Sequence, residues 1–172
     1  MKSFTAISGF ALIGLLFATD VDAQVTEIVA VEVTFVSVIT ITAINPLRFG
    51  LLDDAMLSGE QVVIAPGGGV TDDQSNIVVT AQQFAADMII NATGGASISI
   101  LIDSPVGGTD YTLGTFMCEY EAVPAAVCDG PSMNVTAVAS GALRVGVTLT
   151  SDVASITAGN QDGSFDVTVT YQ

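Results

Sequence analysis

The sequence predicts an all-β fold, a single antiparallel β-sandwich preceded by an extended N-terminal strand. Three observations lead to this prediction. Val, Ile and Thr dominate the chain after residue 24, several segments alternate apolar and polar residues, and glycine-rich turns separate these segments. Many short strands joined by such turns are typical of a sandwich. We find no linker and no internal repeat, so residues 38–172 are expected to form one domain.

The first 23 residues are expected to be a secretory signal peptide. Lys2 precedes a run of 14 mostly apolar residues, Phe4 to Phe17, which is short for a membrane span of about 20 residues. Val21 and Ala23 fit the small-residue cleavage pattern, so cleavage is predicted after Ala23. The protein is therefore expected to be secreted to the cell surface by way of the periplasm, with no membrane span in the mature chain.

The segment from residue 24 to residue 37 is interpreted as an extended arm and candidate donor strand. Its odd positions from 29 onward are almost all apolar, which gives one apolar face, whereas Glu27 and Glu32 argue against a membrane helix. The alternation blurs near Ser37, so a new strand is expected over 38–44, ending at Asn45-Pro46. The predicted donor residues are Val25, Ile28, Val29, Val31, Val33 and Phe35. Such an arm must pair with a sheet, either in its own sandwich or in a neighbouring subunit.

The remaining strands are predicted from local pattern. The clearest is the last, where apolar residues from Phe165 to Tyr171 alternate with polar ones. A helical turn is an alternative for 82–88, and a bulge is expected near Gly146. The other predicted strands are 61–65, 84–90, 96–102, 116–122 and 142–150.

Cys118 and Cys128 are expected to form a structural disulfide. They are ten residues apart in a chain that we expect to be exported, and an oxidising compartment favours the bond. A redox-active pair is the alternative. It is disfavoured because Glu119, Glu121 and Asp129 would surround the sulfurs with negative charge, whereas reactive thiols lie in electropositive surroundings.

Composition excludes several functions. The chain has 18 acidic residues, 3 basic residues and no histidine, a formal charge of −15. Histidine-dependent catalysis is thus excluded, and anionic nucleic acid is an unfavourable partner. The adjacent acidic pairs Asp53-Asp54 and Asp72-Asp73 are interpreted as turn residues rather than as a catalytic pair, and we expect no enzyme. No cofactor is expected. Calcium is the weak alternative, with oxygen ligands from Asp72, Asp73 and Asn76, or from Asn160 and Asp162.

The C-terminal pattern resembles that of pilus subunits assembled by the chaperone–usher route. It has a glycine, Gly159, fourteen residues from the end, a penultimate Tyr171, and between them the alternating residues Phe165, Val167 and Val169. The resemblance implies an immunoglobulin-like, pilin-like sandwich and a head-to-tail filament of copies of this chain. It also implies a periplasmic chaperone as partner. The sequence departs from the pilus family in the late position of its cysteines and in the lack of glycine in residues 24–36.

A second resemblance covers residues 47–50 (LRFG), 59–68 (GEQVVIAPGG) and 163–172 (GSFDVTVTYQ). These segments are similar to a bacterial family of exported β-proteins of unknown function, whose layout is like that of fimbrial subunits. The function expected from the sequence is a structural subunit of an extracellular filament. The alternative is a monomeric secreted adhesin or carbohydrate-binding module, for which the tyrosines Tyr111, Tyr120 and Tyr171 would be the stacking residues.

Overall fold

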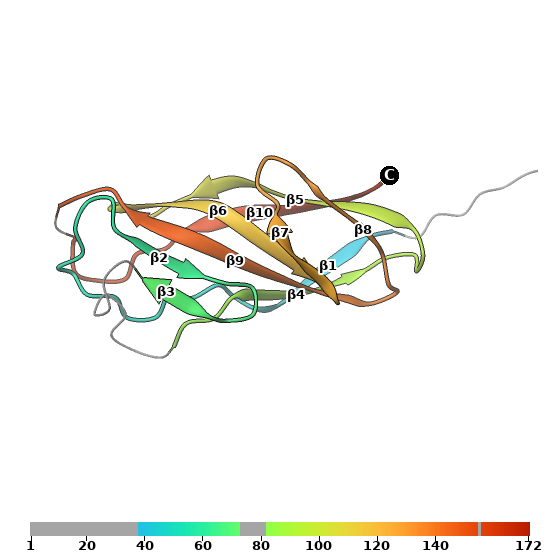
Figure 1. The fold of residues 1–172 in the computed structure, drawn as a ribbon, viewed down its shortest axis with the longest axis horizontal. Helices are drawn as coiled ribbons and strands as arrows, with labels where there is room; N and C mark the ends of the chain where they lie inside the picture. The colour runs from blue at the N-terminus through green and yellow to red at the C-terminus, as the bar shows by residue number, and fades with distance from the viewer. Residues whose placement is uncertain (1–37, 73–81, 155) are drawn as a thin grey trace, which may run out of the picture. The chain divides into compact units, whose positions relative to one another are not determined.

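The computed structural model describes residues 38–72, 82–154 and 156–172, and in these ranges it is built from strands and contains no helix (Figure 1). All of them belong to one compact unit. The strands are β1 (Thr40–Asn45), β2 (Gln61–Ile64), β3 (Val70–Asp72), β4 (Ala86–Asn91), β5 (Ser97–Val106), β6 (Tyr111–Tyr120), β7 (Val123–Val127), β8 (Met133–Thr136), β9 (Gly141–Ser151) and β10 (Ser164–Tyr171).

The larger sheet is organised around β9, its longest strand. One side of β9 pairs with β6 along its length, and β6 in turn pairs with β7. The other side is shared by two strands, because β4 pairs with the first half of β9 and β2 with the second half. Strand β1 extends the sheet beyond β4, and β3 extends it beyond β2. The partner of β9 therefore changes close to Gly146, where the sheet forks.

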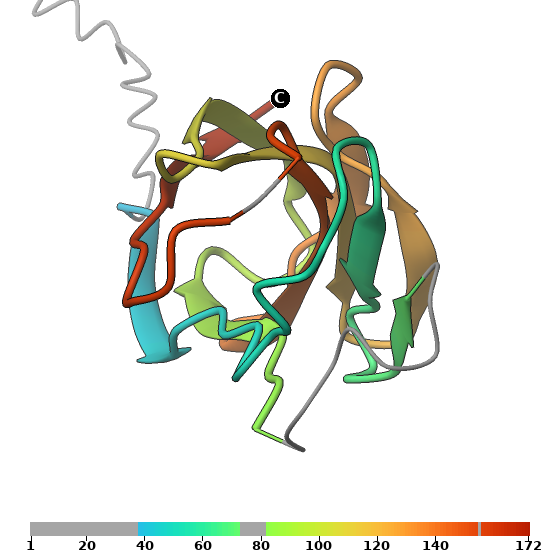
Figure 2. The same cartoon turned by 90° about the vertical axis from the view of Figure 1, so that its left-hand side faces the viewer.

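The smaller sheet has the order β10-β5-β8, and both ladders are antiparallel. The two sheets form a sandwich-like arrangement, as the end-on view in Figure 2 shows. Besides a small buried cluster of Met56, Val62 and Leu149, alternate residues of both sheets point inward and form one main core, because neighbouring residues on a strand lie on opposite faces. The fully buried members include Ile98 and Ile100 of β5, Phe116 of β6, and Leu143 and Val145 of β9.

The predicted all-β sandwich is thus confirmed, and most predicted strands are present with shifted ends. The alternative of a helical turn over 82–88 is wrong: Phe84 forms a β-bridge with Arg48, and β4 begins at Ala86. The bulge expected near Gly146 lies on the facing strand, where β6 uses one more residue than β9 between Gly114 and Met117. The short strands β3, β7 and β8 were not predicted. The predicted signal peptide and arm lie outside the described residues.

Candidate assembly edge

One long side of the sandwich is closed by the segment that leads from β7 to β8. Cys128 and Asp129 cross from the larger sheet to the smaller one, where the Ile102 N–H of β5 donates to the Cys128 carbonyl over 2.8 Å. Ile102 and Asp129 form a parallel bridge at the same point. Strands β5 and β6, which belong to different sheets, are also in contact, as are β7 and β8. Backbone hydrogen bonding therefore joins the two sheets here.

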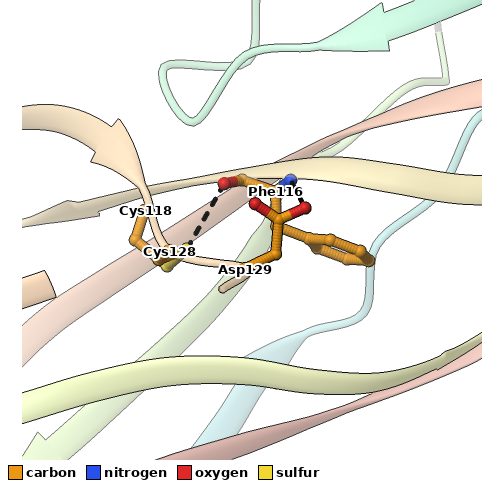
Figure 3. Close-up of a disulfide and its surroundings, with 4 residues drawn as sticks. All are labelled: Phe116, Cys118, Cys128 and Asp129. Atoms are coloured by element: carbon orange, nitrogen blue, oxygen red, sulfur yellow. Dashed lines mark hydrogen bonds between the residues drawn. A yellow bond between two sulfur atoms is a disulfide. The ribbon is translucent and has the colours of Figure 1, made fainter. Parts of the chain in front are cut away.

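A disulfide fixes this crossing to the larger sheet (Figure 3). Cys118 of β6 and Cys128 are bonded, with both side chains fully buried, so the predicted structural disulfide is confirmed. Beside it, the Cys128 N–H donates to the Phe116 carbonyl over 3.0 Å, and the Phe116 N–H donates to the Asp129 carboxylate over 3.0 Å. Two backbone groups at the β6 bulge are thus satisfied by the residues that make the crossing.

The opposite side is bordered by β1 of the larger sheet and β10 of the smaller one. Figure 2 shows both strands on the same side of the unit. In the described part of the chain, β1 pairs only with β4 and β10 only with β5, and no ladder connects β1 to β10. Each strand therefore presents one edge of backbone N–H and C=O groups that no described strand occupies.

The apolar face of β10 is only partly covered. Phe165, Val167, Val169 and Tyr171 all point toward the core and all remain half-buried, whereas the equivalent residues of the neighbouring β5 are fully buried. Phe165 packs its ring on Phe116 with centroids 5.0 Å apart. The inward face of β10 thus contributes to the core and still retains apolar surface accessible from outside.

Strand β1 shows the same incomplete coverage. All six of its residues are exposed, and Ile41 exposes 37% of its surface. Just before the strand, Ile39 packs against the core cluster. Two edge strands with incompletely covered apolar residues therefore border one core from its two sheets, and an added strand that buried these residues would gain apolar burial besides its backbone hydrogen bonds.

The beginning of β10 is positioned by Asp110, which lies 6% exposed in the turn before β6. Its carboxylate accepts hydrogen bonds from the Thr157 N–H over 2.7 Å and from the Gln161 side-chain amide over 2.8 Å. The Gln161 side chain in turn accepts from the Asp110 N–H over 3.2 Å. These bonds tie the connection between β9 and β10 to the turn between β5 and β6.

Hydrogen bonding also sets the charge state at this point. The N–H of Thr157, followed by the amide of Gln161, lowers the pKa of Asp110 below its ordinary value of 3.8, because both donors favour the ionised carboxylate. Next to it, partial burial raises the pKa of Tyr111, and the negative charge of Asp162 adds to the effect. The Asp110 carboxylate is therefore ionised at neutral pH and holds its donors as an anion.

The end of β10 is held by Tyr171. Its phenol oxygen accepts a hydrogen bond from the Thr93 N–H over 2.8 Å and donates to the Thr93 hydroxyl over 3.2 Å. Thr93 lies in the turn between β4 and β5, so Tyr171 connects the smaller sheet to a turn that leaves the larger one. Both ends of β10 are thus fixed by side-chain hydrogen bonds, while its outer edge remains without a ladder partner among the described strands.

The structure brings four of the five C-terminal residues singled out from the sequence onto one face of β10. Gly159, the fifth, lies in the connection before the strand with φ of +137°, so it belongs to the turn rather than to the strand. The arm residues Val25, Ile28, Val29, Val31, Val33 and Phe35 lie outside the described residues. Sequence reasoning missed Asp110, Gln161 and Thr93, which look like ordinary turn residues.

The structure gives little support for the calcium ligands predicted from the sequence or for a turn at Asp72. Asp72 ends β3 and is part of a strand rather than a loop, and Asp73 and Asn76 lie outside the described residues. Asn160 and Asp162 lie in the connection before β10. In the part of the chain that the structure describes, no three His, Cys, Asp or Glu side chains gather closely enough to hold a metal ion.

A comparison with known protein families identifies the family of this chain. A family model described as a domain of unknown function, DUF4402, matches residues 39–171. The chain belongs to this family. The match begins just before β1 and ends at the last residue of β10, so it covers both edge strands. No curated protein and no solved structure matched the chain. Within the described residues, no helix is long and apolar enough to cross a membrane.

Proposed function

We propose that this DUF4402 protein is a structural subunit of an extracellular filament that polymerises by donor-strand complementation. The arm of one subunit would enter the edge between β1 and β10 of the next subunit. The observation that carries the proposal is the half-buried apolar face of β10 beside an edge with no described ladder partner. A strand added there gains backbone hydrogen bonds along the edge and covers the apolar residues.

The arm and the edge match in length and pattern. The inward residues of β10 occupy alternate positions over a seven-residue span, Phe165, Val167, Val169 and Tyr171. The arm offers apolar residues with the same spacing over the same length, Val29, Val31, Val33 and Phe35. Because side chains alternate between faces with a period of two, such a segment can place all four side chains toward one core.

The sequence between arm and β1 favours insertion into a neighbour. For the arm to pair beside β1 of its own subunit, the chain would have to reverse within residues 35–40, FVSVIT. This segment contains no Gly, Pro, Asn or Asp, and it is rich in β-branched residues, which disfavour a tight hairpin turn. An arm that continues outward reaches the next subunit, and a head-to-tail contact that does not close on itself builds a fibre.

The charge of the chain fits this mode of cohesion. After removal of residues 1–23, only Arg48 and Arg144 would balance 16 acidic residues. Of these two, Arg144 lies within 4 Å of Asp87 and Glu119 of its own sheet. Contacts between subunits would therefore rest on strand pairing and apolar burial rather than on ion pairs. In this proposal a chaperone is a transient partner that covers the edge before assembly.

The decisive experiment disables the donor arm and the acceptor edge in two separate variants. A variant lacking residues 24–36 keeps the β10 edge but has no donor, and Val167→Lys keeps the donor but places a charge on the acceptor face. We expect each to lose polymers on its own and the two to form a dimer when mixed, measured by size-exclusion chromatography. Unheated electrophoresis and electron microscopy of the unaltered chain should show a ladder and filaments.

A matched pair of arm variants tests which face of the arm packs against the neighbouring subunit. Val31→Asp places a charge on the apolar face and should abolish polymers, whereas Glu32→Ser changes the opposite face and should keep them. Circular dichroism checks that each variant is folded. Filaments formed without residues 24–36 would exclude the arm as donor. A single monomeric species of the unaltered chain would instead favour the secreted binding module.

A further inference from the structure

A cleft of about 300 Å³ lies on the larger sheet, away from the edge of β10. It is bordered by the turn between β2 and β3, by the residues that precede and begin β4, and by Arg144 of β9. The lining residues used below are Phe84, Asp87 and Arg144. No residue of β10 lines the cleft, and of β1 only its last residue, Asn45, does so.

The fork in the sheet accounts for this cleft. Val145 of β9 pairs with β4, and Val147, two residues later, pairs with β2, so the two partner strands diverge beside Gly146. A Cβ atom at Gly146 would lie 2.2 Å from the carbonyl oxygen of Ile64 and 2.7 Å from Pro66. The glycine therefore allows the β2–β3 turn to approach β9 closely, and that turn forms one wall.

The aromatic group at the cleft is held by the backbone. Phe84 and Arg48 exchange two backbone hydrogen bonds of 2.9 Å, which fixes the position of Phe84 in the chain. Phe84 nevertheless remains 53% exposed as a residue. A positioned and half-exposed ring offers an apolar surface on which a flat ligand face can pack.

The cleft is also lined by an arginine, Arg144, whose N–H donors are available to a ligand. Arg144 lies 3.9 Å from the Asp87 carboxylate and 3.6 Å from that of Glu119, and half of its side chain is exposed. Both distances exceed that of a good hydrogen bond, so the carboxylates orient the guanidinium without occupying its donors. Its planar fork of N–H groups suits two adjacent oxygen atoms, and Asp87 can accept from a ligand hydroxyl.

We propose that this cleft binds a neutral sugar unit, with the ring packed on Phe84 and two neighbouring hydroxyls held by Arg144 and Asp87. The carboxylates beside Arg144 balance its charge, and a chain with a formal charge of −15 disfavours an anionic ligand. This inference does not rest on the proposed assembly, since Phe84, Asp87 and Arg144 belong to neither β1 nor β10.

Saturation-transfer difference NMR on the full chain tests the proposal, because it detects weak ligands whether or not the protein is assembled. The probes are D-glucose, D-galactose, D-mannose and sodium D-glucuronate, each at tens of millimolar. We expect transfer to at least one neutral hexose, with a Kd in the millimolar range typical of so small a contact, and weaker transfer to glucuronate.

Three variants assign the signal to the cleft. Phe84→Ala removes the packing surface, and Arg144→Lys keeps the charge but removes the planar fork, so each should weaken binding about tenfold. Leu57→Ala shortens a comparably exposed side chain outside the cleft and should change nothing. The proposal is overturned if none of the hexoses receives saturation, if Phe84→Ala or Arg144→Lys binds like the unaltered chain, or if glucuronate binds more tightly than all three hexoses.

Discussion

The two long sides of the sandwich are built in opposite ways. Where β7 leads to β8, the sheets are joined by a backbone bridge at Ile102, by the hydrogen bond that the Phe116 N–H donates to the Asp129 carboxylate, and by the disulfide of Cys118 and Cys128. Where β1 and β10 border the core, no ladder joins the sheets within the described ranges, and the apolar residues of β10 stay half-buried.

This difference shows which side of the sandwich can accept a strand from a partner. Where covalent and backbone bonds join the two sheets, a strand cannot enter between them without breaking these bonds. On the open side, β10 is held by its ladder with β5 and by Asp110 and Tyr171 at its two ends, so its outer edge stays in place and still offers hydrogen-bonding groups. We therefore expect the closed side to dominate stability and the open side to dominate assembly.

The largest effect on stability is expected from the disulfide. Replacing both cysteines, Cys118→Ala with Cys128→Ala, removes a constraint on a short loop, and the chain-entropy model puts the loss at about 3 kcal/mol in the free energy of unfolding. Urea unfolding of the double variant against the unaltered chain measures it.

Amide hydrogen exchange locates that loss. The Ile102 amide, which bonds to the Cys128 carbonyl, should exchange faster in the double variant, while the Thr93 amide on the other side should keep its rate relative to global unfolding. Equal acceleration at both amides would contradict the claim that the two sides are stabilised separately.

A smaller effect, which depends on pH, is expected from Asp110. Its folded pKa is lower than its ordinary value of 3.8, so it contributes stability that is present above that value and is lost as pH falls through the folded pKa. Asp110→Asn should lower stability at pH 7 and flatten its fall below pH 4. Asp162→Asn is the matched control, because it removes an exposed carboxylate in the same connection. Thermal unfolding from pH 2 to pH 7 measures both, and identical profiles would rule out the positioning role of Asp110.

The sequence predicted these parts of the molecule unequally. The alternation from Phe165 to Tyr171 identified β10 and its inward face, because a half-buried strand needs that pattern. The two cysteines also indicated their bond. Strand β7 was missed because Pro124 and two alanines give it little strand character, and its residues are all exposed.

The anchors of β10 could not be found in this way. Asp110 is fifty-one residues from Gln161 in the chain, and Tyr171 is seventy-eight from Thr93. Only the fold brings them together, and each alone resembles a common turn or strand residue. The fork at Gly146 is likewise a property of pairing, since no local pattern shows that β9 exchanges one partner for another.

The smallest effect is expected at the far end of β10. Tyr171→Phe keeps the ring and removes both hydrogen bonds to Thr93, each of which typically contributes about 1 kcal/mol in proteins and less where water can replace it. The Thr93 amide should exchange faster while the Ile102 amide keeps its rate, the reverse of the cysteine variant. If the tie to Thr93 holds the acceptor edge in place, the variant should also polymerise more slowly, measured by light scattering of purified subunits. Unchanged polymerisation with accelerated exchange would show that the edge is held by its ladder with β5 alone.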